Sequence, residues 1–278
     1  MSIGSNIKRL RENTKNGKKL TQEQLAEQLG VTFQAVSSWE RDEYLPETAN
    51  VLKLMKALDT SADAILDDRK WDFETKETIY KWEHMKTYVK TIARVHDLSN
   101  TLKAIDFAVR AHDGQSRKNT TLPYIIHPLH LACHALALNI IDDEIIAACM
   151  LHDVVEDCKD KGIELKDLPV DDNTKELVRL LTRVKGSGEN RAEELEAYYG
   201  AMLSNPKAAL IKCLDRCNNL TTMSWGLSRD KIYRTINETE QYYPALLDVL
   251  KGTSEYSNAA WLLKYQIESM LDIYKRLM

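Results

Sequence analysis

The sequence predicts an all-α protein, and three observations lead to that prediction. Apolar residues recur at spacings of three and four along most of the 278 residues, which is the period of a helix buried on one face. Ten glycines and six prolines leave few helix breakers in a chain of this length. The alternation of apolar and polar residues that marks a half-buried strand is hard to find. With 44% hydrophobic residues the chain can build a core, and its length allows two domains.

Residues 1–68 are expected to form a five-helix domain that contains a helix-turn-helix. Thr21 precedes a short helical segment, and Gln24 follows three residues later, which is the pattern of a capping box. Gly30 is expected to end that helix, and the next helix is expected to end before Pro46. Two short helices joined by a glycine turn are what a helix-turn-helix requires.

The second helix of this pair is expected to bury Val36 and Trp39 and to leave its polar side chains outside. The residues of the domain that are expected to contact DNA are Gln22, Thr32, Gln34, Ser37 and Ser38.

A family pattern runs through this block. Its matching residues are Thr21-Gln22, Leu25-Ala26, Gly30-Val31, Ser38-Trp39-Glu40, Pro46, and Leu54 with Ala57-Leu58. On these residues the block resembles the XRE, or Cro/repressor-like, family. The resemblance implies that Gln22 caps a helix against phosphate and that Gln34 and Ser38 reach base edges of double-stranded DNA. Such modules read palindromes as dimers, so a homodimer bound through residues 1–66 is expected.

An alternative for this block is a helix-turn-helix that serves only as a protein-protein module. Its positive and negative side chains nearly balance, whereas a surface that grips phosphates is usually basic. Residues 69–98 follow as a charged, helical connector with spaced aromatic residues. These aromatics either help two chains to pair or pack within one chain. Residues 99–278 are expected to form a second helical domain.

The bulk properties of the chain exclude several classes of protein. A net charge of −4 excludes a basic nucleic-acid coat, although it permits a local DNA-reading patch. The cysteines lack the spacing of a disulfide framework, and the pair Cys213 and Cys217 has no second pair with which to bind zinc. Neither a signal peptide nor a membrane span is expected, because no apolar run reaches the required length. We therefore expect a cytoplasmic protein with no membrane association.

Four polar residues interrupt the apolar run 145–158, which otherwise reads as a buried helix. They are His152, Asp153, Glu156 and Asp157. Spacings of four place them on one side of a continuous helix. Because an unpaired ion is costly to bury, such a cluster predicts a metal site or a catalytic site.

Further candidates for this site lie elsewhere in the chain. His127 precedes Pro128 at the expected start of a helix, and Asp215 interrupts another apolar helix. With His152 and Asp153 they offer two nitrogen and two oxygen ligands, a set that suits Mn²⁺, Zn²⁺ or Fe²⁺. His130 and His134 are expected to be core histidines, although a site built from these two and His127 is the alternative.

Five separated segments carry a second family pattern. They read FAVRAHDGQSRK, PYIIHPLHLA, AACMLHDVVED, LIKCLDRCNNL and INETEQYYPALLDVL. Over residues 102–250 the chain resembles the HD hydrolase domain of RelA/SpoT enzymes and small alarmone hydrolases. This resemblance implies Mn²⁺-dependent removal of the 3′-pyrophosphate from guanosine tetra- or pentaphosphate, (p)ppGpp. No synthetase domain follows, so synthesis of the alarmone is not expected.

The resemblance also implies a role for each matching residue. The implied metal ligands are His127, His152, Asp153 and Asp215. Glu156 and Asp157 would orient and deprotonate the attacking water, and His112 would support the site. The implied substrate contacts are Arg117 and Lys118 along the guanine, Asn219 and Thr222 at the nucleoside, and Arg183 in the place of a common lysine.

Two alternatives to this activity remain open. Between Lys118 and Pro123 the chain reads NTTL, which is one residue longer than the usual turn and lacks its glycine. A different nucleotide is therefore a second candidate substrate. The other alternative is a repressor whose HD domain senses a nucleotide with little or no hydrolysis. The complete ligand set favours the enzyme, since a sensor needs no pair of water-activating carboxylates.

Overall fold

The chain forms two compact units, Met1–Thr78 and Ile79–Met278, which we call unit 1 and unit 2. A computed structural model describes residues 3–12, 19–66, 81–117, 121–183, 191–223 and 228–277. Within these ranges the regular elements are helices, and extended pairing is limited to one bridge between Ser116 and Pro123. The prediction of an all-α protein is confirmed.

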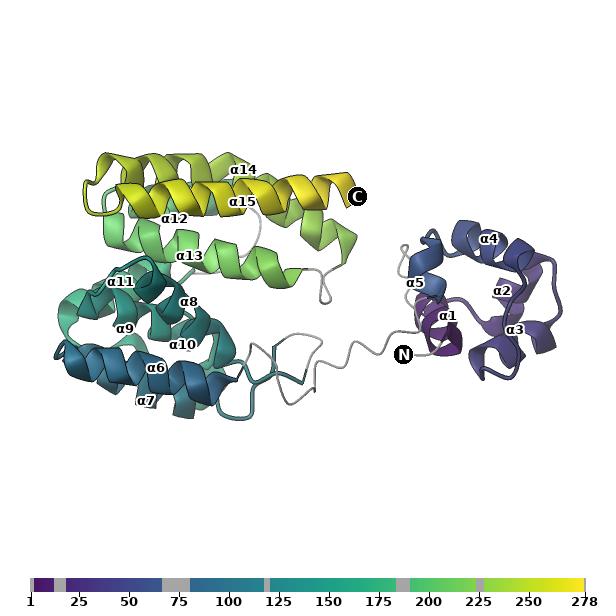
Figure 1. Ribbon diagram of the computed structural model, residues 1–278, viewed down its shortest axis with the longest axis horizontal. Coiled ribbons are helices and arrows are strands. Elements are labelled where there is room, and N and C mark those ends of the chain that lie inside the picture. The colour runs from purple at the N-terminus through teal and green to yellow at the C-terminus, as the bar shows by residue number, and fades with distance from the viewer. Residues whose placement is uncertain are drawn as a thin grey trace. The chain divides into compact units, whose positions relative to one another are not determined.

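Unit 1 is a cluster of short helices around a small apolar core (Figure 1). Its helices are α1 Ile3–Glu12, α2 Gln22–Leu29, α3 Phe33–Glu40, α4 Thr48–Ala57 and α5 Ala62–Leu66.

The turn between α2 and α3 has the local structure that the sequence predicts. The Thr21 hydroxyl accepts a hydrogen bond from the Gln24 amide at 3.1 Å, and the Gln24 side chain accepts one from the Thr21 amide at 2.9 Å. Gly30 ends α2 with a φ of 66°, a left-handed conformation that glycine adopts without steric cost. The capping box and the glycine stop are therefore confirmed.

Unit 2 contains ten α-helices and two 3₁₀ turns within its described residues. They are α6 Trp82–Val95, α7 Ser99–Ala111, α8 Ile126–Ala137, α9 Asp143–Leu151, α10 Val154–Asp157, η1 Lys159–Lys161, η2 Leu165–Asp167, α11 Asp172–Leu181, α12 Arg191–Met202, α13 Pro206–Thr222, α14 Arg229–Gly252 and α15 Ser257–Leu277.

Helix α9 lies at the centre of unit 2. Every residue from Ile145 to Leu151 is fully buried, because α7, α8, α11 and α13 surround the helix. An all-apolar stretch of helix such as 145–151 is stable only when it is covered on every side. The Asp142 side chain begins it by accepting a hydrogen bond from the Ile145 amide at 3.0 Å.

Helix α6 is the second half of the segment 69–98 that the sequence assigns to a connector. It packs against α7 and α8, with Val89 and Ala93 buried and Val89 part of the apolar core of unit 2. Residues 69–80 lie outside the described residues.

The helix is interrupted where the sequence predicts an uninterrupted one. Helix α9 ends at Leu151, and α10 begins only at Val154. The His152 ring Nδ1 lies 2.9 Å from the Cys149 carbonyl oxygen, which a continuing helix would offer to the amide of Asp153. The expectation of one continuous helical face is thus wrong at this point, because His152 and Asp153 lie between two separate helices.

Candidate metal centre

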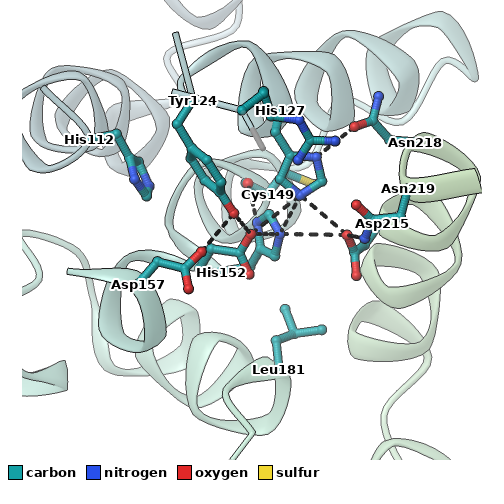
Figure 2. A network of polar contacts seen from close by, with 12 residues as sticks. His112, Tyr124, His127, Cys149, His152, Asp157, Leu181, Asp215, Asn218 and Asn219 are labelled. Carbon is teal, nitrogen blue, oxygen red and sulfur yellow. Dashed lines mark hydrogen bonds and ion pairs between the residues drawn. The ribbon is translucent and has the colours of Figure 1, made fainter. Parts of the chain in front are cut away.

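Four side chains from three segments converge in unit 2 (Figure 2). The Nε2 atoms of His127, from α8, and His152, after α9, lie 3.2 Å apart. Asp215, from the middle of α13, places Oδ1 3.3 Å from the first nitrogen and 3.9 Å from the second. These three residues are buried and form the group of possible metal ligands within the described part of the chain. Asp153 lies outside that group, but its Oδ2 is 3.3 Å and 3.1 Å from the same two nitrogens.

The partners of the two imidazoles determine which ring nitrogens carry protons. Nδ1 of His152 faces a backbone carbonyl, which can only accept, so Nδ1 holds the proton. Nδ1 of His127 faces Oδ1 of Asn218 at 2.6 Å, while the same amide's nitrogen faces Nδ1 of His130 at 2.9 Å. The Nε2 atoms of both rings therefore point at the same place, and each can offer a lone pair to a metal. Two lone pairs and two carboxylates repel one another unless a cation stands between them, so this donor set fits a divalent metal.

The electrostatics of the centre also favour positive charge. Burial lowers the pKa of His127, but the carboxylates of Asp153 and Asp215 outweigh it and raise that pKa to about 9. Burial raises the pKa of Asp215, yet Lys212 and the two imidazoles hold it far below its ordinary range. Both shifts mean that the site stabilises a cation beside ionised carboxylates.

Two neighbours on α13 hold Asp215 in place. The Lys212 ammonium lies 2.9 Å from Oδ2, and the Asn219 amide donates to Oδ1 at 2.6 Å. Asn219 is predicted from the resemblance to contact a nucleoside, whereas here it contacts a candidate metal ligand. Lys212 balances part of the negative charge that the carboxylates bring to the centre.

The predicted water-activating pair lies beside the centre on α10. The Tyr124 hydroxyl contacts Oδ2 of Asp153 at 2.6 Å and Oδ2 of Asp157 at 2.8 Å. Burial and the charge of Asp153 raise the pKa of Asp157. Glu156 is half-buried one turn from His152. Their catalytic roles remain predictions.

Arg117 and Thr222 are predicted substrate contacts, and the structure joins them. The Arg117 guanidinium donates to the Thr222 hydroxyl at 2.8 Å and lies 5.8 Å from the centre of the Tyr124 ring. Lys118 lies outside the described residues. A cation, a hydroxyl and an aromatic ring thus line one side of the centre.

Arg183 occupies a different place. It lines a cavity of about 440 Å³ between α11, α12 and η2, together with Thr182 and Tyr198. Its Nε is buried without a hydrogen-bond partner. The Lys212 ammonium, which contacts Asp215, lies 5.5 Å from the centre of the Tyr198 ring.

The other histidines near the centre have supporting contacts. His112 stacks on Tyr124 with ring centres 4.7 Å apart, and its Nδ1 lies 2.7 Å from Gln115. Burial, first of all, lowers the pKa of His130 to about 4, so its neutral ring accepts the hydrogen bond from Asn218. His130 is half-buried, and its core role stays a prediction.

Sequence reasoning missed Tyr124 and Asn218. Each is one contact removed from the candidate ligands, and neither interrupts an apolar helix as a charge does. The spacing of these two residues from the candidate ligands was the one indication in the sequence. Tyr124 lies three residues before His127, and Asn218 lies three residues after Asp215. A spacing of three puts two side chains on neighbouring positions of one turn.

The candidate DNA contacts of unit 1 differ in exposure. Thr32 and Gln34 are exposed, and Ser38 is half-buried. Gln22 is half-buried and donates to Glu40 at 2.7 Å.

Ser37 is buried, so its expected place on the exposed face of α3 is wrong. It lies between Val36 and Glu40 on the inward stripe of the helix, and its hydroxyl accepts a hydrogen bond from Arg41.

Among the described residues, every helix is too short or too polar to cross a lipid bilayer.

Two family models match the chain. The model described as "Helix-turn-helix" covers residues 7–65, and the model described as "HD domain" covers residues 104–246.

Several curated proteins are similar to this chain. A guanosine-3′,5′-bis(diphosphate) 3′-pyrophosphohydrolase from Aquifex aeolicus is 31% identical over 169 residues, which are 60% of this chain and 22% of the relative. The bifunctional (p)ppGpp synthase/hydrolase SpoT of Escherichia coli is 30% identical over 173 residues, 60% of this chain and 24% of its own. The chain thus spans less than a quarter of the length of these relatives.

One similar solved structure is described as "A metazoan ortholog of SpoT hydrolyzes ppGpp and plays a role in starvation responses". Its sequence identity is 21% and its TM-score is 0.49, over 63% of this chain and 96% of that one.

Proposed function

The chain belongs to the HD domain family, and we propose that it is a metal-dependent hydrolase that removes the 3′-pyrophosphate of (p)ppGpp. The family model covers residues 104–246, more than half of the 278-residue chain. The observation that carries the proposal is the convergence of two imidazole lone pairs and two carboxylates on one point. The names of the relatives supply the substrate class.

His127, His152, Asp153 and Asp215 would hold the metal. A divalent ion such as Mn²⁺ would supply the positive charge that acidifies water and neutralises a phosphate oxygen. The protein's part is to hold the ligands in the correct tautomer and orientation. Asn218 and the Cys149 carbonyl do this for the two rings.

Glu156 and Asp157 would orient the attacking water and accept its proton. Both lie on α10, directly after the candidate ligands. The raised pKa of Asp157 favours such a role, because a general base works best when its pKa approaches the working pH. The water oxygen would bond to the phosphorus that carries the ribose 3′-oxygen, and the bond between that phosphorus and the 3′-oxygen would break. Pyrophosphate would be released with the water oxygen, and the 3′-oxygen would leave as a hydroxyl with the proton that the carboxylate took from the water.

Arg117 and Thr222 would contact the nucleoside, with Lys118 and Arg183 as further cations. A planar guanidinium stacks on a base and pairs with phosphate equally well. The resemblance implies that Asn219 also contacts the nucleoside. Because Asn219 donates a hydrogen bond to Asp215, it would touch both the substrate and a candidate metal ligand.

Unit 1 would bind double-stranded DNA through α3, with Gln34 and Ser38 at base edges and Gln22 at a phosphate. The match to the helix-turn-helix model supports this role. Because such modules read two half-sites, a homodimer is part of the proposal.

Incubation of the full chain with ppGpp and Mn²⁺ tests the activity. We expect release of pyrophosphate, and its loss together with bound metal in Asp153→Ala. Asp160→Ala is the matched control, since it removes an exposed carboxylate from the neighbouring turn η1. Tight ppGpp binding without turnover by the metal-loaded protein would contradict the hydrolase and support a nucleotide sensor.

A further inference from the structure

Two imidazoles on α8 share one side-chain amide of α13. His127 and His130 are three residues apart, so their rings lie on neighbouring positions of one helical turn. Oδ1 of Asn218 lies 2.6 Å from Nδ1 of His127, a contact that Figure 2 shows. Nδ2 of the same amide lies 2.9 Å from Nδ1 of His130. The amide therefore joins a candidate metal ligand to a histidine that is not one of the candidate ligands.

The protons along this chain of contacts follow by elimination. An amide nitrogen can only donate, so Nδ1 of His130 must accept, and the proton of that ring is on Nε2. The amide oxygen can only accept, so Nδ1 of His127 must donate. Nε2 of His127 is then the atom that faces the candidate ligands, and it lies 3.2 Å from Nε2 of His152.

His130 is in the protonation state that this chain requires. The residue is half-buried, and burial is the largest of the causes that lower its pKa to about 4. The neighbouring His127 and Arg117 act in the same direction. The ring of His130 is therefore neutral near pH 7, and only a neutral ring has a lone pair with which to accept.

His130 can decide which end of the Asn218 amide faces His127. The two ends have nearly the same size, so a half-turn of the group exchanges its oxygen and its nitrogen. In the reversed orientation the nitrogen would donate to Nδ1 of His127, and that ring would carry its proton on Nε2, where a metal would bind. The amide oxygen would then face the lone pair of His130, and the two would repel each other.

We propose that His130 is a positioning residue for the candidate metal centre, because its Nδ1 holds the Asn218 amide with the oxygen toward His127. The inference rests on the proposed function, since the centre that it concerns is the one that would bind the metal. Partners of a ligating imidazole fix its tautomer and its direction. His130 acts one contact further out, on the partner itself.

Two other roles for His130 fit its contacts less well. A role as a ligand is disfavoured because its Nδ1 already accepts from Asn218. In the described part of the chain, the group of possible ligands consists of His127, His152 and Asp215. A role in packing alone would be met by any side chain of similar size, and the variants below use that difference.

Variants with and without an acceptor at residue 130 separate the hydrogen bond from packing. His130→Asn can place an amide oxygen where Nδ1 stands in the histidine. His130→Leu, of nearly the same size as asparagine, and His130→Phe, which keeps a ring, have no acceptor. Titration of the full chain with Mn²⁺, with the free ion measured by electron paramagnetic resonance, gives the dissociation constant of each protein.

We expect His130→Leu and His130→Phe to raise the Mn²⁺ dissociation constant about tenfold, the lower end of the usual effect of losing a partner of a ligating histidine. His130→Asn should stay close to wild type. His134→Leu is the matched control, because His134 is also half-buried on α8, one turn further along. The proposal is overturned if His130→Leu binds Mn²⁺ like His134→Leu, or if His130→Asn binds it as weakly as His130→Leu.

A double-mutant cycle tests whether His130 acts through Asn218. In an Asn218→Ala background, His130→Leu should cause no further loss of Mn²⁺ affinity, since the amide that His130 holds is gone. Losses that add would show that the two residues act separately and would contradict the proposal. Circular dichroism and thermal unfolding of each variant ensure that the affinities compared are those of folded proteins.

This inference and the proposed function fail separately, because Mn²⁺ affinity is measured without ppGpp. A wild type that binds Mn²⁺ but releases no pyrophosphate would overturn the hydrolase alone. A hydrolase whose Mn²⁺ affinity does not depend on residue 130 would overturn the role of His130 alone. A wild type that binds no divalent metal would overturn both.

Discussion

The Tyr124 hydroxyl donates a hydrogen bond to a carboxylate oxygen of Asp157, with the two oxygens 2.8 Å apart. The phenol has one proton, and its shorter contact, 2.6 Å, is with Asp153. The contact with Asp157 is therefore the weaker of the two. Burial and the neighbouring charge of Asp153 raise the pKa of Asp157, and the hydrogen bond from Tyr124 opposes that rise. Tyr124 links the candidate metal centre to the candidate base.

Tyr124→Phe should weaken metal binding without unfolding unit 2. The ring volume is kept, but Asp153 loses the hydrogen bond that orients it. Loss of such a partner typically lowers metal affinity about 10–100-fold. Titration with Mn²⁺ measures the effect. Tyr242→Phe, a buried tyrosine on α14, is the control, and equal affinities in the two variants would refute the role of Tyr124.

Asn218→Ala should weaken metal binding because His127 loses the acceptor that fixes its tautomer. Asn218→Asp keeps an acceptor at that place and should restore most of the affinity. Metal competition with a chromogenic chelator compares the three proteins. If alanine and aspartate behave alike, Asn218 acts through packing and not through the ring proton.

Glu238→Gln should alter the acid stability of unit 2. Glu238 bonds the buried Arg216 at 2.7 Å. Burial raises the pKa of Glu238, but the charge of Arg216 outweighs it and lowers that pKa below the ordinary value. A lowered folded pKa gives stability that is present above the unfolded pKa of about 4.3 and is lost as pH falls through the folded one.

Urea unfolding at neutral and at acidic pH measures this difference. At pH 7 the Glu238→Gln variant should have a free energy of unfolding lower by about 3 kcal/mol, because it leaves a buried guanidinium unpaired. As pH falls and the Glu238 carboxylate of the wild type becomes protonated, the difference in free energy of unfolding between the variant and the wild type should become smaller. Glu255→Gln, at an exposed position, should show no such gap. A gap for Glu238→Gln that does not depend on pH would exclude the ion pair as its cause.

Thr21→Ala should destabilise unit 1 by about 1 kcal/mol, the usual cost of a lost helix cap. The variant removes the hydroxyl that accepts from the Gln24 amide. Thermal unfolding of the full chain, followed in the transition of unit 1, measures it. Thr48→Ala, at the first turn of α4, is the control. An unchanged transition in Thr21→Ala would show that the cap contributes nothing.

Features that depend on neighbours along the chain can be predicted from the sequence. Helical periodicity, the capping box of Thr21 and Gln24, and the glycine stop at Gly30 follow from interactions within one or two turns. The interruption of apolar helices by His152 and Asp215 was equally visible, since a buried charge needs a reason wherever the helix lies.

Which atoms meet depends on the tertiary structure. The His152 ring lies against a backbone carbonyl at the end of α9, Ser37 is buried on α3, and the Tyr124 hydroxyl bonds Asp157, 33 residues away along the chain. Asn218 and His127 are 91 residues apart, and their contact orients the His127 ring at the candidate metal centre. Such contacts depend on how whole helices pack against one another, and no local spacing encodes the distance between two atoms on different helices.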